Sequence, residues 1–580
     1  MLSRTTIDIS SPMPPPPWAC MERALMTSVT DACIAFYSKY FDERGYLLCV
    51  PRWGGDDGPD DAIENLTDWP ILYALGGEEI LLDMCKQAQD GHIRQYTEAK
   101  TVDVPFARDG MYYKEFPVHG DWLHLGESMS VFGALGLSDH KDLDYERRLR
   151  KWAGLYMNED PEAPNYDPEH KIIRSLYNGS RGPLLRKATA LDWTGDPIEE
   201  NRFVLLHGER NYQEMLAHFK DYTDIIGDHP SNLVATGLGY DAYALTGEEK
   251  YRDWVLEYVD AWADRARENN GILPSNIGLD GKIGGACDGK WWGGCYGWGF
   301  TTVIPQNGQP AHRNTVPLGI AGFGNALLLT GDQSYVGVWR TMLDAVNMNK
   351  KETDGQTMYP NMFGDEGWYH FTPEPFANGA LNIYFWSMDQ KDRTRVSAHP
   401  WISYLEGRND HYPIEALQAD FGTVRKKIEW IRNDPTTPDT RLSDNPNPYN
   451  PATVGTLFQM MTGGLPPYRA QAVHTRLWYF DPDQRRPGLP EDTGALVEKI
   501  TKDEVVVTLV NMNQLEDHEI TVQGGAYGEH QCLSVTIDGT ETDVDDASFS
   551  VLLKAGSGHR LVIKQKRYAN QPTFRRPWER

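Results

Sequence analysis

The sequence predicts a mainly α-helical fold: an (α/α)n toroid of about five to six helix pairs, followed by a C-terminal antiparallel, β-sandwich-like domain. Three observations support this. Helix pairs recur through most of the chain, Pro, Asp and Asn become frequent at 433–451, and short β-branched runs follow. We therefore divide the 580 residues into an extended leader at 1–17, a helical catalytic domain at 18–465 and a β domain at 466–580.

The helix pairs share one pattern, in which an apolar helix ends in a Gly or Asp turn and a second helix with a broad apolar stripe follows. Four such pairs have their turns near Gly76, Gly136, Gly247 and Gly331, and a fifth is expected within 377–431. After Gly247 the stripe consists of Tyr251, Trp254, Val255, Tyr258, Val259 and Trp262. Because each pair needs a neighbour to cover its apolar face, the pairs must stack on one another.

Two features favour a closed ring over an open superhelix. The insertions between pairs are long and irregular, and the first helices, such as 232–245 and 319–329, are rich in small residues and apolar nearly all round. We expect these helices to form an inner layer. The loops that precede them would then converge on one mouth, where chemistry is expected.

The β domain is predicted from short runs of β-branched residues. These runs are 505–510, 520–522, 533–537, 549–553 and 561–563. Asp538 and Gly539 follow the third run and are typical of a tight turn between antiparallel strands.

Charge and hydropathy exclude some classes of function. The formal net charge of −27 disfavours a nucleic-acid partner, and no run of 18 apolar residues predicts a membrane helix. No signal peptide is visible, so we expect a cytoplasmic protein, or a periplasmic or secreted one if a leader has been removed. Seven scattered cysteines without a CxxC spacing predict neither a disulfide framework nor a cysteine-based zinc site.

On its helix pairs and β runs the chain resembles the carbohydrate-active enzymes built on an α/α toroid, particularly polysaccharide lyases with a C-terminal antiparallel β domain. The resemblance covers nearly the whole chain, but it rests on architecture and no family motif is matched residue by residue. It implies an enzyme that acts on an oligosaccharide or polysaccharide, which we expect to be acidic. Many toroidal glycoside hydrolases carry their β domain first, so the domain order favours a lyase.

The first loop before an inner helix is rich in carboxylates. Residues 56–64 contain five acids, of which Asp57, Asp61 and Glu64 are candidates for substrate binding. Asp61 also fits the role of a helix N-cap.

The second loop combines histidines with an acid. If a helix begins near Asp121, then His124 and Glu127 lie one turn apart and can share a proton or a ligand. His119, Asp121 and His124 are therefore catalytic candidates, and the alternative is an Asp121 N-cap beside structural histidines. No cofactor is required, but a divalent metal near His119 and His124 is kept as an alternative.

The loops before the third and fourth inner helices carry Asn232, His312, Arg313 and Asn314. β-Elimination next to a uronic acid needs Arg or Asn to stabilise the carboxylate, and His or Tyr to move protons. Both asparagines also fit helix caps.

A glycine-rich aromatic segment at 287–300 is the other notable motif. Its glycines argue against a helix or a central strand, so we expect a loop that presents rings to a sugar, or a lid packed on the toroid. Tyr296 is its candidate acid or base. The remaining candidates for substrate binding are Trp291, Trp292 and Trp298 from this segment, Trp368, Tyr369 and His370 from a second loop at 359–371, and Arg181.

Three hypotheses follow. The first is a lyase for uronic-acid glycans, with His124 or Tyr296 in proton transfer and Arg313 or Asn232 at the carboxylate. The second is a glycoside hydrolase that uses two carboxylates. Its candidate acids are Asp56, Asp57, Asp61, Glu64 and Glu374. The third is a non-catalytic helical-repeat scaffold, against which the polar loops and the aromatic segment weigh.

Overall fold

A computed structural model describes most of the chain. The described residues are 5–50, 59, 61–99, 109–110, 112–116, 122–175, 178–180, 182–194, 211–220, 226–295, 297–303, 308–466 and 471–580.

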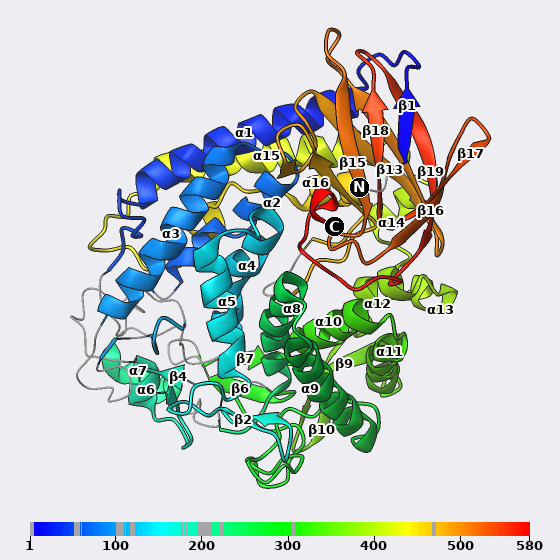
Figure 1. Cartoon of the computed structure of the whole chain (residues 1–580). Helices are drawn as coiled ribbons and strands as arrows, with labels where there is room; N and C mark the ends of the chain where they lie inside the picture. The colour runs from blue at the N-terminus through cyan, green and yellow to red at the C-terminus, as the bar shows by residue number, and fades with distance from the viewer. Residues whose placement is uncertain are drawn as a thin grey trace.

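The helical part is built from pairs, as the sequence predicts (Figure 1). The first helices of the pairs are α2 (Trp69–Ala74), α4 (Trp122–Ser138), α8 (Thr236–Thr246), α10 (Ile320–Thr330), α12 (Ala380–Ser387) and α16 (Gly455–Thr462). The helices outside them are α1 (Pro17–Tyr40), α3 (Glu79–Glu98), α5 (Leu143–Leu155), α9 (Glu249–Glu268), α11 (Ser334–Asn347) and α15 (Tyr412–Asn433). Shorter helices are α6 (Ala190–Thr194), α7 (Tyr212–Phe219), α13 (Gln390–Arg393) and α14 (Pro400–Leu405).

Burial separates the two layers. In α8 every residue from Thr236 to Ala244 is buried, and in α10 every residue from Ile320 to Leu329. In α9 and α11 only one stripe is buried, which includes the predicted position Trp254 in α9 and Trp339 in α11. Helices that are apolar all round form the interior, and helices with one apolar stripe cover them.

The helical region returns on itself. Helix α2 packs on α4, α4 on α8 and α8 on α10, while α1 near the start of the chain packs along α15 near the end of the helical region (Figure 1). This contact is expected of a ring and not of an open rod. The number of pairs stays a prediction, because α13, η6 (Thr394–Val396) and α14 interrupt the alternation after α12.

The C-terminal part contains two five-stranded sheets, in the orders β1-β18-β15-β11-β12 and β13-β14-β19-β16-β17. The strands are β11 (Leu477–Asp481), β12 (Arg486–Pro487), β13 (Thr493–Ile500), β14 (Glu504–Asn511), β15 (His518–Gly524), β16 (Gln531–Ile537), β17 (Thr540–Asp546), β18 (Ser548–Leu553) and β19 (Gly558–Lys566). All five predicted runs fall on strands. Asp538 and Gly539, with φ of 48° and 79°, make the predicted turn between β16 and β17.

Residues 1–17, predicted to be an extended leader, are partly built into the sheet. Strand β1 (Thr6–Ile9) pairs in parallel with β18 at the edge of the first sheet. Ile7 and Ile9 are buried while Thr6 and Asp8 face outward, so the strand contributes an apolar face to the domain. The two ends of the chain therefore share one sheet.

The β domain and the C-terminal tail cover the C-terminal ends of the inner helices. The last carbonyl groups of a helix have no partner within the helix, and here they accept hydrogen bonds from this part of the chain. The pairs are Arg486 to Tyr73 O (3.0 Å), Arg576 to Ser138 O (3.1 Å), Phe574 N to Ala244 O (2.9 Å) and Arg567 to Phe385 O (3.1 Å). The loops that were expected to carry chemistry lie at the opposite, N-terminal ends.

Several short elements lie at these N-terminal ends and in the insertions. The 3-10 helices η1 (Ala62–Leu66), η4 (Pro230–Ala235) and η5 (Val316–Gly319) precede α2, α8 and α10, and η7 (Asn447–Tyr449) and η8 (Pro577–Glu579) lie further along the chain. Small sheets contain β2 (Tyr166–Asp167), β3 (Ile172–Ile173), β4 (Asn178–Gly179), β5 (Gly182–Pro183), β6 (Phe300–Val303), β7 (Pro310–Arg313), β8 (Lys351–Thr353), β9 (Gln356–Gly364) and β10 (Gly367–Thr372).

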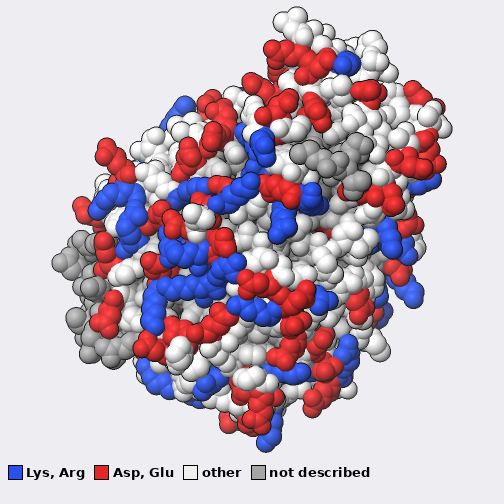
Figure 2. Space-filling view, in the orientation of Figure 1, with Lys and Arg blue, Asp and Glu red and all other residues white. Residues whose placement is uncertain are grey.

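The surface is mixed in charge. On the face shown in Figure 2, Lys and Arg alternate with Asp and Glu and form no single continuous basic surface. In the part of the chain that the structure describes, no helix is both long and apolar enough to span a bilayer.

Candidate functional site

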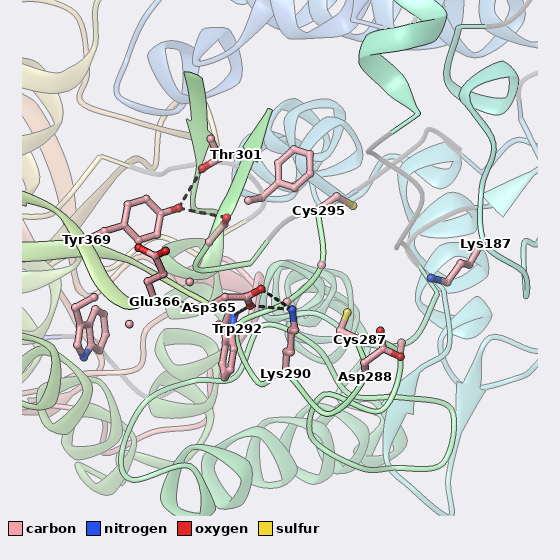
Figure 3. Close-up of a pocket in the computed structure, with 18 residues that line it drawn as sticks. Lys187, Cys287, Asp288, Lys290, Trp292, Cys295, Thr301, Asp365, Glu366 and Tyr369 are labelled. Carbon is pink, nitrogen blue, oxygen red and sulfur yellow. Dashed lines mark hydrogen bonds and ion pairs between the residues drawn. The ribbon is translucent and has the colours of Figure 1, made fainter. Parts of the chain in front are cut away.

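A cavity of about 760 Å³ lies between the glycine-rich aromatic segment and the β9–β10 hairpin (Figure 3). We call it the trough. Its polar and aromatic lining includes Asp288, Lys290, Trp292, Asp365, Trp368 and Tyr369. In the close-up, Lys290 and Trp292 lie beside Asp365, Glu366 and Tyr369 lie to one side, and Asp288 and Lys187 lie to the other.

The glycines of the segment allow close contact between backbones. A Cβ atom at Gly299 would lie 2.1 Å from the carbonyl oxygen of Phe363 in β9, and one at Gly297 would lie 2.3 Å from Ser275 Oγ. The amide of Phe363 donates to Trp298 O at 3.2 Å. The segment therefore lies directly against the hairpin, and glycine is required because any side chain would separate the two.

The aromatic residues of the segment divide into two roles. Trp298, predicted to contact substrate, is fully buried and donates to Leu273 O at 2.8 Å, so it belongs to the core. The ring centroids of Trp291 and Trp292 lie 4.7 and 5.1 Å from that of Phe363, and of these two rings only Trp292 lines the trough. Trp368 from β10 lines it as well. Trp298 therefore packs in the core, whereas Trp292 and Trp368 line the cavity.

An ion pair fixes one carboxylate of the trough. Lys290 Nζ lies 2.8 Å from Asp365, and Trp292 Nε1 donates to the same carboxylate at 3.3 Å. The hydrogen bond from Lys290 holds the pKa of Asp365 below its ordinary value. Asp365 is therefore ionised at neutral pH and held by two donors.

The charges of the trough do not favour an acidic ligand. Among the described residues, its lining contains three carboxylates, Asp288, Asp365 and Glu366, and two cations, Lys187 and Lys290, and no arginine. Since Lys290 is paired with Asp365, a second anion would meet an excess of negative charge.

A chain of hydrogen bonds links the trough to His312. Tyr369 Oη donates to Gly299 O at 3.2 Å and lies 3.0 Å from Thr301 Oγ1, which in turn lies 2.7 Å from His312 Nδ1. The ring of His370 lies 5.2 Å from that of His312. Partial burial, and then the charge of His370, lower the pKa of His312.

The segment 359–371, predicted to be a loop, is the β9–β10 hairpin. Its strands pair from Tyr359–Thr372 to Gly364–Gly367, with Asp365 and Glu366 at the turn. The hairpin was missed because aromatic and glycine residues obscure its alternation. It brings Tyr369 and His370 beside His312, which the sequence had nominated from a different loop.

Other predicted residues lie away from the trough. Asn232 is fully buried, and its Nδ2 donates to Asp228 at 2.7 Å. Tyr258 Oη donates to the same carboxylate at 2.9 Å, and burial raises the pKa of Asp228 to about 6. Asn232 therefore serves to hold the start of η4 in place.

Asn314 supports the start of the next inner helix. Its Oδ1 accepts from the amide of Val316, the first residue of η5, at 3.2 Å, and its Nδ2 donates to Asn361 O at 3.2 Å in β9. Arg313 lies on β7, in register with Phe300.

The acids of the first loop that are described lie inside the protein. Asp61 and Glu64 are buried beside and within η1, and Glu64 accepts a hydrogen bond from Asn447 Nδ2 at 3.0 Å. Glu374 is exposed after β10 and does not line the trough. None of these three lies in the trough.

The remaining candidates lie outside the described residues and stay predictions. They are Asp56, Asp57, His119, Asp121, Arg181 and Tyr296, together with the side chain of His124, whose backbone lies in the first turn of α4. The alternative of a divalent metal near His119 and His124 therefore also stays a prediction.

The residues of this site that sequence reasoning missed are Lys187, Asp288, Lys290, Thr301, Asp365 and Glu366. Lys290 and Asp365 are 75 positions apart, so no local pattern connects them. A weak signal exists at 364–367, where two acids are flanked by glycines between aromatic runs, which is typical of a hairpin turn.

Comparison with known proteins gives one family match and several remote structural likenesses. The family model described as "Domain of unknown function (DUF8034)" matches residues 6–399. No curated protein matches.

The likenesses to solved structures are weak. The GH76A α-1,6-mannanase from Salegentibacter sp. HEL1_6 is 10% identical over 75% of this chain and 98% of its own, with a TM-score of 0.31. A family 76 glycoside hydrolase from a bovine Bacteroides thetaiotaomicron strain is 11% identical over 75% of this chain and 78% of its own, with a TM-score of 0.36. Cellobiose 2-epimerase from Bacillus thermoamylovorans B4167 is 13% identical over 64% of this chain and 100% of its own, with a TM-score of 0.23.

TM-scores this low transfer neither fold details nor activity to this chain. The family match is of a different kind, because it extends from β1 through η6 and so includes the trough and the inner helices from α2 to α12. The chain belongs to the family described as Domain of unknown function (DUF8034).

Proposed function

We propose that the trough binds an oligosaccharide and that the protein is a glycoside hydrolase. One observation carries the proposal: the cavity combines two half-buried indole rings, Trp292 and Trp368, with three carboxylates. Flat apolar rings with polar edges suit pyranose rings, and hydrolysis of a glycosidic bond ordinarily needs two carboxyl groups. This is the second of the three hypotheses from the sequence, with different carboxylates.

The carboxylates of the trough suit a division of roles. Hydrolysis needs one ionised group as base or nucleophile and one protonated group as acid. Asp365 is the candidate for the ionised group, because Lys290 and Trp292 Nε1 stabilise its negative charge. Glu366 and Asp288 lie on either side of it and are the candidates for the acid (Figure 3).

The charge balance favours a neutral glycan over the acidic one expected from the sequence. Elimination next to a uronic acid requires a cation or a strong donor at the sugar carboxylate. In the described part of the lining the cations are Lys290, which already pairs with Asp365, and Lys187, and no arginine is among these residues. A hydrolase for neutral sugars therefore fits the trough better than a lyase.

A lyase remains the second candidate because of one observation. Tyr369, Thr301 and His312 form a hydrogen-bonded chain at the side of the trough, and Arg313 follows in the sequence. Tyr, His and Arg are the residue types that β-elimination uses.

The test is an incubation of the purified protein with neutral and uronic-acid oligosaccharides, in which reducing ends and ultraviolet absorbance are followed together. We expect new reducing ends on a neutral glycan without absorbance from an unsaturated sugar. Asp365→Asn should lower the rate by about 10²-fold or more, whereas Asp354→Asn, in the β8–β9 turn, should leave it unchanged. New absorbance would establish the lyase, and no product from a broad panel would favour the scaffold.

A further inference from the structure

One arrangement of protons makes all three contacts between Gly299 and His312 hydrogen bonds. A carbonyl oxygen only accepts, and a tyrosine or threonine hydroxyl carries one proton. Tyr369 Oη, at 3.2 Å, donates its proton to Gly299 O. Tyr369 can then only accept from Thr301, whose Oγ1 lies 3.0 Å away.

This direction fixes the proton on the imidazole. Since Thr301 donates its proton to Tyr369, its oxygen must accept at the 2.7 Å contact with His312 Nδ1. In the neutral ring only one nitrogen carries hydrogen, so Nδ1 is protonated and Nε2 is left with a lone pair. Among the described residues Nε2 of His312 meets no other polar group within hydrogen-bond distance.

The backbone of His370 gives a second, independent indication. His370 lies within β10 but has φ of 52°, in the left-handed region that non-glycine residues adopt uncommonly and that a regular strand excludes. Its neighbours Tyr369 and Phe371 keep their register with β9, so the distortion is confined to this residue. Such strain persists where surrounding structure enforces it, and it often marks a functional position.

The backbone conformation of His370 places its imidazole ring beside that of His312. The rings of His370 and His312 lie 5.2 Å apart at 33°, and the ring of Tyr369 lies 5.9 Å from that of His312. Two cationic rings at this distance repel each other, so the neutral form of His312 is favoured. The histidine, tyrosine and threonine side chains form one polar cluster at the side of the trough, and Thr301 and Tyr369 also line it.

We infer that His312 is a neutral hydrogen-bond acceptor for a hydroxyl group of the bound saccharide, with Nε2 as the accepting atom and the tautomer set by Thr301 and Tyr369. This inference rests on the proposed saccharide-binding function. It extends the trough by one subsite beyond the indole rings, on the side of Tyr369. This subsite would recognise a sugar hydroxyl group that donates its hydrogen bond to Nε2 of His312.

The tautomer is tested without any substrate. Long-range ¹H–¹⁵N spectra of the protein labelled at the histidine ring nitrogens report which nitrogen carries the proton, and a His312→Asn variant assigns the signal among the 16 histidines. We expect hydrogen on Nδ1, and a mixture of tautomers in Thr301→Val. Hydrogen on Nε2, or an unchanged signal in Thr301→Val, would overturn the inference.

The acceptor role is tested by two amide variants of one position. Gln places its amide oxygen near Nε2, so His312→Gln should bind the oligosaccharide within about twofold of the wild type. Asn retains a donor near Nδ1 and offers nothing at Nε2, so His312→Asn should bind about tenfold more weakly, or about 1.4 kcal/mol. Tryptophan fluorescence titration, with a melting curve for each variant, measures both.

The outcomes separate this inference from the proposed function. If the wild type binds sugar but the two variants bind equally, the acceptor role is wrong and the saccharide site stands. If the wild type binds no sugar in a broad panel, the proposed function and the acceptor's ligand both fail, while the tautomer result stands on its own.

Discussion

Gly299 is the position at which the geometry of the trough can be disturbed with the smallest change. In Gly299→Ala the new Cβ would lie 2.1 Å from Phe363 O. The two backbones must therefore separate by about 1 Å or more to reach ordinary contact. Because φ of Gly299 is not positive, the effect comes from this collision and not from backbone strain.

The expected effects follow from this displacement. Overpacking of this kind costs about 1–3 kcal/mol of stability. The displaced segment carries the Gly299 carbonyl that accepts from Tyr369, and it is continuous with the side of the trough that holds Trp292. A displacement of about 1 Å at a site commonly lowers the rate by about 10²-fold, so we expect a fall of that order in kcat/KM.

Gly337→Ala is the matched control. Gly337 lies in α11 and a Cβ there would meet nothing within 4 Å. Alanine is the better helix former, so the melting temperature should stay equal or rise, with unchanged activity. Thermal unfolding and saccharide cleavage are measured for both variants side by side. If Gly299→Ala kept its activity within twofold of the wild type, the shape of the trough would not depend on the close contact between residues 287–300 and the β9–β10 hairpin.

Three further predictions test the fold and its titrating groups. Arg567→Ala removes donors to the carbonyl groups at the end of α12 and should cost about 1–3 kcal/mol, seen as a lower melting temperature; an unchanged melting temperature would contradict the capping role. Burial raises the pKa of Glu529 from 4.5 to about 8, so the folded state keeps a proton that the unfolded state has lost, and stability should fall as pH rises from 4.5 to 8. In Glu529→Gln the free energy of unfolding, measured by denaturant titration at several pH values, should fall less between pH 4.5 and 8. The same fall as in the wild type would refute the role of Glu529. His370→Asn removes the charge that lowers the pKa of His312, so the acidic limit of saccharide binding should move to higher pH in titrations, and an unmoved limit would contradict the coupling.

The helical architecture could be predicted from the sequence because its signals are local. The apolar stripe that contains Trp254 and Trp262 repeats every three or four residues, and the all-apolar segment before Gly331 has the length of one inner helix. The β domain was predicted in outline for the same reason. Strand β1 was not, because its partner Ser550–Leu553 lies at the other end of the chain and pairing at that distance leaves no local pattern.

The site could be predicted only in part. The aromatic segment and His312, Tyr369 and His370 were nominated by residue type, but their assembly depends on the β9–β10 hairpin. Trp298 and Trp292 have similar neighbours in the sequence. The structure distinguishes them, because Trp298 is buried and donates a hydrogen bond to Leu273 O, whereas Trp292 lines the trough. The loops at 51–58 and 117–121 hold other nominated residues that lie outside the described part of the chain.

The central claim is that a saccharide lies in the trough against Trp292 and Trp368. A crystal structure of the protein soaked with a neutral oligosaccharide that it binds is the most direct measurement. We predict a pyranose ring on an indole face, with a hydroxyl or the glycosidic oxygen within hydrogen-bond distance of Asp365. Sugar bound only elsewhere at saturating concentration, with the trough empty, would contradict the account.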